Sequence, residues 1–176
     1  LYAETSRTAS TITVEKGSLT AEGITIDGQI GNQTYYNSMT YLKGLPHVAV
    51  TLNNCTLTNS LPNSVTYSLY SVYFEDMAEG IDLTIDNCKS DKGIVARVNT
   101  GDNVTVTNSS MSSFTYSSIE NGSLVFTGNE VSGIANIEAD KLAVKDDTIK
   151  GGLIFGGRGD VTLENMNVTS DGTATG

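Results

Sequence analysis

Apolar and polar positions along this chain follow a ten-residue pattern that recurs seven times, and each copy is called a decad here. Its first position is apolar, its third is apolar or small, its fifth is a turn former, and its eighth is apolar except at Ser90. The copies are LTAEGITIDG from Leu19, VTLNNCTLTN from Val50, LTIDNCKSDK from Leu83, VTVTNSSMSS from Val104, LVFTGNEVSG from Leu124, LAVKDDTIKG from Leu142 and VTLENMNVTS from Val161. Because alternate side chains of a strand point to opposite faces, the two-residue period predicts short strands separated by a sharp turn.

The spacing of the decads predicts how the strands are arranged. Their starts lie 31, 33, 21, 20, 18 and 19 residues apart. A period near 20 residues without helical periodicity is typical of a stacked solenoid, in which each coil pairs with the next. We therefore expect an all-β, single-stranded parallel β-helix of about seven coils, with the two long intervals forming enlarged coils. Residues 1–18 are predicted to be an N-terminal cap or lead-in strand, and residues 19–176 the β-helix of a single domain.

A second apolar segment follows most decads and predicts a third strand in each coil. These segments cover residues 69–74, 94–98, 114–119, 134–137 and 153–155. Stacking in register would also align the fifth positions, so the amides of four asparagines are predicted to bond one another in a ladder. These are Asn54, Asn87, Asn108 and Asn165. Gly23 and Gly128 suit the same turn, because glycine and asparagine both tolerate the left-handed conformation.

The decads, with their asparagine corner, resemble the coils of right-handed parallel β-helix proteins of the pectate-lyase-like superfamily. The resemblance covers residues 19–172 and implies a right-handed coil. Within that superfamily, LTAEGITIDG and GSLVFTGN are most similar to bacterial adhesin-like and autotransporter-passenger surface proteins. Phe126 with Asn129 matches an FxxN element of such coils, and residues 151–153 approximate a GGA-type element. The resemblance implies a cell-surface protein rather than one particular activity.

Charge excludes two classes of partner. The chain has 10 basic and 20 acidic residues and a net charge of −10, so nucleic acid and anionic membrane surfaces would be repelled. No run approaches the ~18 apolar residues of a membrane span. The acidic composition, rich in serine, threonine and asparagine, favours an exported, extracellular or cell-surface protein.

Few residues suggest catalysis. Four of the predicted third-strand segments contain one charged residue, Arg97, which cannot by itself supply the acid and base of polysaccharide cleavage. His47 is the only histidine and has no partners at triad spacing. The neighbouring carboxylates at residues 75–76 and 146–147 are interpreted as solvated turns. We expect no catalytic residues, no cofactor and no metal site.

Cys55 and Cys88 occupy the sixth position of consecutive decads, so they are expected to stack about one strand spacing apart. That distance permits a disulfide. The alternative is a pair of small buried thiols in a core column.

The enlarged coils concentrate the aromatic residues. Their extra residues are predicted at 29–45 and 59–73, and these stretches contain six of the eight tyrosines. The six are Tyr35, Tyr36, Tyr41, Tyr67, Tyr70 and Tyr73. Both insertions follow the eighth position, so we expect them to leave the rod at one corner. There they would form either an exposed surface for a glycan or protein, or a small satellite core.

Arg158, Gly159 and Asp160 spell RGD in a glycine-rich turn, and this resembles the integrin-recognition tripeptide. A turn alone also explains it. The sequence therefore predicts a non-enzymatic segment of an exported surface protein, a rigid stalk or adhesin that presents loops to a glycan or a host or neighbouring surface protein. The alternatives are a carbohydrate-active enzyme with a degenerate or truncated site, and a self-assembling fibre subunit that associates end to end.

Overall fold

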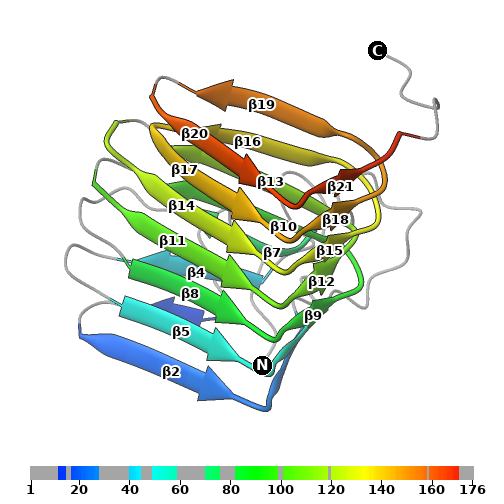
Figure 1. Ribbon diagram of the computed structural model, residues 1–176. Helices are drawn as coiled ribbons and strands as arrows, with labels where there is room; N and C mark the ends of the chain where they lie inside the picture. Colours follow the sequence, from blue (N-terminus) through cyan, green and yellow to red (C-terminus); the bar gives the residue numbers. More distant parts are fainter. Residues whose placement is uncertain are drawn as a thin grey trace, which may run out of the picture.

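The computed structural model describes residues 12–14, 17–27, 40–44, 49–58, 70–75, 82–98, 101–118, 120–157 and 159–170. Every regular element in these ranges is a β-strand, and all pairings between strands are parallel. The strands form three sheets of seven strands each, and within each sheet the strands are stacked along one axis (Figure 1). The chain is therefore a parallel β-solenoid, and the predicted all-β fold class is confirmed. The hand of the coil stays a prediction.

Each sheet contains one strand from every level of the solenoid, where a level is three consecutive strands, one in each sheet, such as β1, β2 and β3. Sheet A contains β1 (Ile12–Val14), β4 (Thr40–Gly44), β7 (Tyr70–Glu75), β10 (Gly93–Val98), β13 (Ser113–Ser118), β16 (Ala135–Ala139) and β19 (Leu153–Gly157). Sheet B contains β2 (Ser18–Glu22), β5 (Ala49–Asn53), β8 (Asp82–Asp86), β11 (Asn103–Thr107), β14 (Ser123–Thr127), β17 (Lys141–Lys145) and β20 (Val161–Glu164). Sheet C contains β3 (Thr25–Asp27), β6 (Thr56–Thr58), β9 (Lys89–Ser90), β12 (Ser110–Met111), β15 (Glu130–Val131), β18 (Thr148–Ile149) and β21 (Asn167–Val168).

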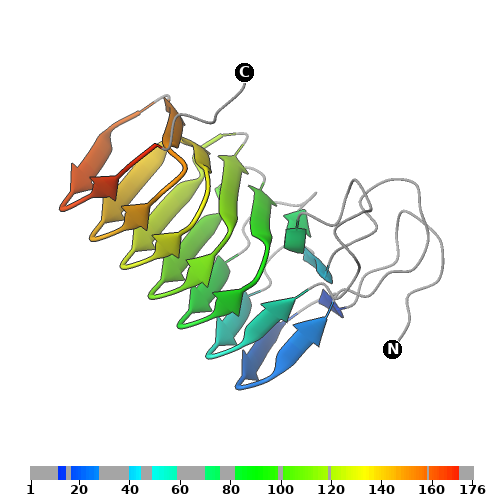
Figure 2. The same ribbon diagram turned by 90° about the vertical axis from the view of Figure 1, so that its right-hand side faces the viewer.

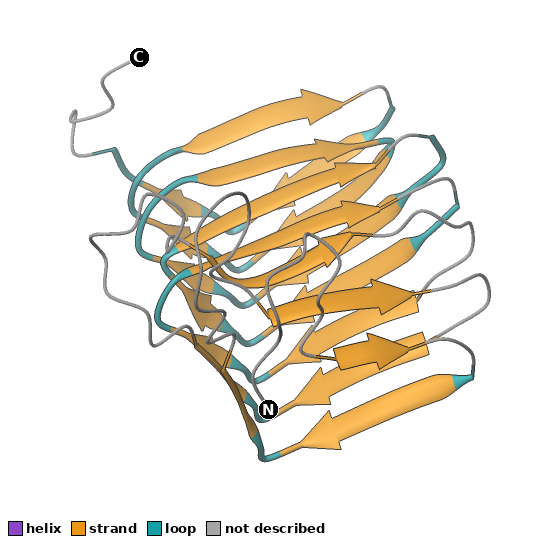
Figure 3. Ribbon diagram, turned by 180° about the vertical axis from the view of Figure 1, so that it is seen from behind, coloured by secondary structure: helices purple, strands orange, loops and turns teal. Residues whose placement is uncertain are grey.

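The decads stack in the predicted register. Each one supplies a strand to sheet B, turns at its fifth position, and supplies a strand to sheet C. First positions pair with first positions along the whole of sheet B, from Leu19 with Val50 to Leu142 with Val161. The predicted third strands form sheet A, which faces the viewer in Figure 3.

Two strands lie where the sequence predicted insertions. β4 falls inside the stretch 29–45, and most of β7 falls inside 59–73. Both are regular strands of sheet A, because β4 pairs with β1 on one side and with β7 on the other. Part of the first expected insertion is therefore a third strand that the sequence did not predict. β7 agrees with the third strand predicted at residues 69–74, which overlaps the second expected insertion. The remaining residues of both stretches lie outside the described ranges.

The interior is filled by the first, third and eighth positions of the decads together with alternate residues of sheet A. Leu52, Ile85 and Val106 on sheet B are completely buried. Sheet A contributes Phe114, whose ring stacks on that of Phe126 in sheet B with centroids 4.6 Å apart. Ser90, the one polar eighth position, is buried as well, and its hydroxyl donates to the carbonyl of Lys92 at 2.8 Å.

The two ends of the solenoid differ in exposure, and they lie at opposite ends of the stack (Figure 2). At the first level Val14, Ala21 and Ile26 are at most 8% exposed, although Ile24 at the sixth decad position is 44% exposed. At the last level Leu163 is 51% exposed and Val168 is 42% exposed. Apolar side chains are therefore open to solvent at the level of β19, β20 and β21.

Candidate functional site

Backbone pairing in sheet A brings several of the predicted site residues into adjacent registers. Tyr41 on β4 pairs with Tyr73 on β7, and Tyr73 pairs with Val95 on β10. The same row continues through Thr115 and Asn136. We call this set the tyrosine row. Val95 is only 3% exposed although Thr115, its register partner, is half-buried on the outward face.

Among the described residues, the remaining candidate tyrosine, Tyr70, does not belong to the tyrosine row. Tyr70 begins β7 and pairs with Gly93 across a register shift. Tyr35, Tyr36 and Tyr67 lie outside the described residues. The structure therefore brings Tyr41 and Tyr73 together as backbone neighbours and places Tyr70 on the same strand as Tyr73.

A second register row of sheet A contains three charged residues. Glu75 pairs with Arg97, Arg97 with Ser117, and Ser117 with Glu138. Arg97 was expected to be the only charged residue over these segments because residues 134–137 were taken as the complete strand. β16 extends to Ala139. The alternation of Ala135, Ile137 and Ala139 continues past the predicted end, and this signal could have identified Glu138.

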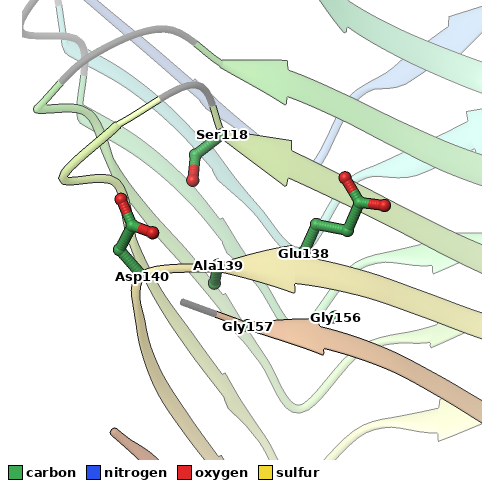
Figure 4. Close-up of a pocket in the computed structure, with 6 residues that line it drawn as sticks. All are labelled: Ser118, Glu138, Ala139, Asp140, Gly156 and Gly157. Atoms are coloured by element: carbon green, nitrogen blue, oxygen red, sulfur yellow. The ribbon is translucent and has the colours of Figure 1, made fainter. Parts of the chain in front are cut away.

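The charged row ends at an open hollow of about 260 Å³ (Figure 4). It is lined by Ser118, Glu138, Ala139, Asp140, Gly156 and Gly157. In Figure 4 the Ser118 hydroxyl and the Asp140 carboxylate lie near the end of β16, and the Glu138 carboxylate lies nearer the start of the strand. Asp140 also accepts a hydrogen bond of 2.5 Å from the backbone N–H of Asn121. The hollow therefore offers hydroxyl and carboxylate oxygens to a polar ligand.

A second hollow, of about 170 Å³, lies beside sheet C. Its lining is rich in serine and includes two acidic residues: Ser90, Asp91, Ser110, Met111, Ser112, Glu130 and Ser132. Both carboxylates already have partners, since Asp91 accepts from the Thr58 hydroxyl at 3.0 Å and Glu130 pairs with Lys150 at 2.5 Å. The Lys150 ammonium lowers the pKa of Glu130 by a hydrogen bond and by its charge.

The asparagine corner has the predicted backbone conformation. Asn54, Asn87, Asn108 and Asn165 have φ values of 50–51°, and Gly23 and Gly128 share the left-handed region at 65° and 70°. The backbone N–H at each corner donates to the carbonyl before the next corner, as from Asn54 to Asp86 at 3.0 Å.

The side chains at the corner do not form the continuous amide ladder that the sequence predicted. Asn87 reaches Asn54 at 3.5 Å, but Asn108 donates to the carboxylate of Asp86 and Asn165 to that of Asp146, each at 3.0 Å. A carboxylate is the stronger acceptor and lies within reach at these levels, so it replaces the neighbouring amide. Hydrogen bonds from Thr107 and Asn108 lower the pKa of Asp86.

The sixth positions form a buried polar column that we call the inner column. Cys55, Cys88, Ser109, Asn129 and Asp147 are each at most 2% exposed. Cys55 and Cys88 are free thiols, so the buried-thiol interpretation describes them and the disulfide does not. Burial raises the pKa of Cys88 to about 11.

Asp147 is the residue that sequence reasoning placed wrongly. The pair at residues 146–147 was interpreted as a solvated turn, but only Asp146 is exposed, while Asp147 is 1% exposed. The left-handed corner at Asp146, with φ of 57°, turns the next side chain inward. The sixth-position alignment with Cys55 and Cys88 was a signal for this.

The RGD tripeptide lies between β19 and β20. Gly159 and Asp160 are exposed, and Arg158 is outside the described residues. A Cβ atom on Gly159 would lie 2.1 Å from the carbonyl oxygen of Asp140, so close packing against the level below requires glycine there.

Within the ranges given above, no cluster of three or more histidine, cysteine, aspartate or glutamate side chains has the geometry of a metal site. That part of the chain also contains no helix with the length and apolarity needed to cross a membrane. Comparison with protein-family models, with curated proteins and with solved structures returned no match for this chain.

Proposed function

We propose that this chain is a non-enzymatic segment of an extracellular surface protein, a right-handed β-helix of the pectate-lyase-like type that acts as a stalk and binds glycans on the outer face of sheet A. The observation that carries the proposal is the tyrosine row, in which Tyr41 and Tyr73 are register partners on adjacent strands. Parallel strands lie ~4.8 Å apart, so aromatic rings at these positions would follow one another along the rod. Tyrosine suits such a surface because its ring is apolar and its hydroxyl bonds polar ligands.

The neighbouring outer positions support a polar, extended ligand. Beyond Val95, which is buried, Thr115 and Asn136 continue the tyrosine row, and both are half-buried. The hollow lined by Glu138 and Asp140 adds carboxylate acceptors one row away. Sugar hydroxyls can donate to carboxylates and to amide oxygens and can stack on rings at the same time. A neutral glycan fits better than an acidic one, because the chain has a net charge of −10.

A glycan array followed by calorimetry tests this proposal. Binding to a neutral oligosaccharide should weaken by about fivefold or more in Tyr41→Ala or Tyr73→Ala, since removing an aromatic anchor from a binding surface typically costs more than ~1 kcal/mol. Val125→Ala is the matched control, because Val125 is exposed on the outer face of sheet B. The absence of any glycan ligand, or equal loss in the control, would contradict the proposal.

A degradation assay on neutral and acidic polysaccharides distinguishes the enzymatic alternative from the adhesin proposal. A lyase or hydrolase built on this face would use Arg97 with Glu138 or Asp140, which lie in the charged row or its hollow. We expect no shortening of any polymer. Shortening by the wild-type protein that disappears in Arg97→Ala and Glu138→Gln would replace the adhesin proposal with an enzyme.

Exposed side chains at the last level favour the fibre alternative. Phe155, Leu163 and Val168 are 38–51% exposed at the β19–β21 end, and edge strands with apolar neighbours recruit further strands. A solution mass well above 18.6 kDa that falls to the monomer in Leu163→Lys, but not in Thr162→Lys, would indicate assembly through this end. A protein that stays monomeric at all concentrations would contradict the fibre alternative and favour the stalk.

A further inference from the structure

The inner column follows one hydrogen-bonding rule along most of its length. The side chain at each sixth position accepts a hydrogen bond from the backbone N–H of the sixth residue one level before. The donors and acceptors are Cys55 N–H to Cys88 Sγ at 3.4 Å, Cys88 N–H to Ser109 Oγ at 3.0 Å, Ser109 N–H to Asn129 Oδ1 at 3.0 Å, and Asn129 N–H to Asp147 Oδ1 at 2.6 Å. Each level is thereby joined to the next through a buried polar group.

A second rule concerns what these side chains donate. Three of them reach the carbonyl of the third decad residue one level before: Cys55 Sγ to Ala21 at 3.4 Å, Cys88 Sγ to Leu52 at 3.4 Å, and Asn129 Nδ2 to Val106 at 2.9 Å. The two thiols also lie within hydrogen-bond distance of a carbonyl of their own level, that of Asn53 and that of Asp86, each at 3.3 Å. Ser109 has a shorter side chain and donates within its own level, to Thr107 at 2.8 Å. A long sixth-position side chain therefore needs both an acceptor atom and a donor atom.

Asp147 accepts a hydrogen bond as the first rule requires, but it makes no donor hydrogen bond of the kind that the second rule describes. Its Oδ1 accepts from the backbone N–H of Asn129 and also from Nδ2 of Asn129 at 3.0 Å. Its Oδ2 is fully buried and has no hydrogen-bond partner. By the same register, the carbonyl of the preceding level that faces a donor at this position is that of Phe126, the third residue of the preceding decad. Cys55, Cys88 and Ser109 also reach the carbonyl two residues before them, and the equivalent residue here is Lys145. An ionised carboxylate has no hydrogen to donate and would place an oxygen against an oxygen.

We propose that Asp147 is a neutral carboxylic acid in the folded protein at acidic pH, with its Oδ2–H donating to the Phe126 carbonyl, and that this proton is a pH-sensitive latch between adjacent levels of the solenoid. The latch joins the level of β16–β18 to the level of β13–β15. Loss of the proton leaves a buried charge that the hydrogen bonds to Oδ1 offset only in part, and such a charge is costly in an apolar interior. The latch does not depend on the glycan-binding proposal.

The surroundings of Asp147 favour the neutral form. Burial raises its pKa to about 6, and the charge of Asp146 acts in the same direction, whereas hydrogen bonds from Asn129 and from the backbone of Lys145 oppose them. The nearby cations are engaged elsewhere: Lys145 of the same level pairs with Glu164 of the next at 3.4 Å, and Lys150 pairs with Glu130 of the level before. Asn165 and Met166, on the following level, carry no charge.

The direction of the pH effect follows from linkage. A carboxyl group with a raised pKa in the folded state stabilises the fold below its unfolded pKa, near 3.8, and that stabilisation is lost as pH rises through about 6. Two pH units between these values correspond to a fall of about 100-fold in the folding equilibrium constant. Other groups also titrate, so the effect is isolated by comparing variants at each pH.

The test combines chemical denaturation with NMR. Asp147→Asn supplies a permanent amide donor in place of the acid, as Asn129 does one level before. The variant is expected to match wild type near pH 4 and to exceed its folding constant by about 10-fold to 100-fold at pH 7.5. Asp146→Asn, at the exposed neighbouring position, is the control and should show no such growing difference.

A titration of the wild-type side-chain carboxyl carbons by NMR gives a readout that requires no variant to fold. The Asp147 resonance should titrate well above the ordinary aspartate range. An Asp147 that titrates at or below that range would overturn the proposal. So would an Asp147→Asn variant whose stability relative to wild type is the same at pH 4 and pH 7.5.

Discussion

At the scale of the residue, one backbone angle at the fifth decad position sets the course of the chain. Asn54, Asn87, Asn108, Asp146 and Asn165 adopt positive φ, where most residues with a side chain are strained by ~1–2 kcal/mol. Asparagine and aspartate tolerate this conformation because their short polar side chains bond locally. The corner then directs the sixth side chain inward and the seventh outward, which explains why a polar column can run through an apolar rod.

Replacing a corner asparagine tests this account. Asn87→Ala should lower the free energy of unfolding by about 1–2 kcal/mol, because alanine keeps the Cβ strain and loses the amide contact with Asn54. Asn87→Gly should cost less, since glycine already occupies the equivalent positions 23 and 128. Urea denaturation of the two variants measures the difference. Equal losses would show that the amide contact, rather than the backbone angle, is what matters.

Asp86 should give the opposite pH dependence to Asp147. Because hydrogen bonds from Thr107 at 2.6 Å and Asn108 lower its pKa, it stabilises the fold above pH 3.8, and this contribution is lost as pH falls through its lowered folded value. Asp86→Asn should therefore be less stable than wild type at pH 6, and the gap should narrow toward pH 2. Thr107→Ala should raise the pKa of Asp86 in an NMR titration. An unchanged pKa would show that the hydroxyl contributes little.

At the scale of the element, the decads predicted sheets B and C well, because turn residues and alternating apolar residues fix both strand and register locally. Sheet A was less predictable. β4 contains Tyr41, Leu42 and Lys43 without a clear alternation, so it was assigned to an insertion. Glu138 was missed because the end of a strand is set by its neighbours on adjacent levels. Two features depend on which side chains meet across adjacent levels: the burial of Asp147, and the hydrogen bond that Asn108 makes to Asp86 instead of to an asparagine amide. The pattern within one decad does not show which side chains meet in this way.

Close stacking of glycines at the sheet C to sheet A corner gives a prediction for one element. A Cβ on Gly151 would lie 2.4 Å from the carbonyl carbon of Gly133, so Gly151→Ala should lower the free energy of unfolding by about 1–3 kcal/mol by overpacking. Gly156→Ala is the matched control, because its Cβ would meet only the flexible Glu138 side chain at 3.3 Å. Thermal melts compare them, and similar melting temperatures would contradict the rigid-corner interpretation.

At the scale of the whole molecule, each level contacts mainly the levels before and after it, so stability should vary along the rod. Amides of the central strands β8, β11 and β14, where the third decad positions are fully buried, should exchange most slowly with solvent. Amides of β20 and β21, beside the exposed Leu163 and Val168, should exchange fastest. Hydrogen-exchange NMR measures this gradient. Uniform protection would indicate one cooperative unit instead.

The inner column also gives the levels a fixed order. The decads share one template, so a chain could in principle stack with one level skipped and still pair every strand. Apart from the two consecutive cysteines, the sixth residues differ from level to level, running Ile24, Cys55, Cys88, Ser109, Asn129, Asp147, Met166. Skipping the level of Asp147 would set the Asn129 N–H against the thioether of Met166, a much weaker acceptor. A repeating scaffold thus carries, in its least repetitive position, the information that keeps its levels from slipping past one another.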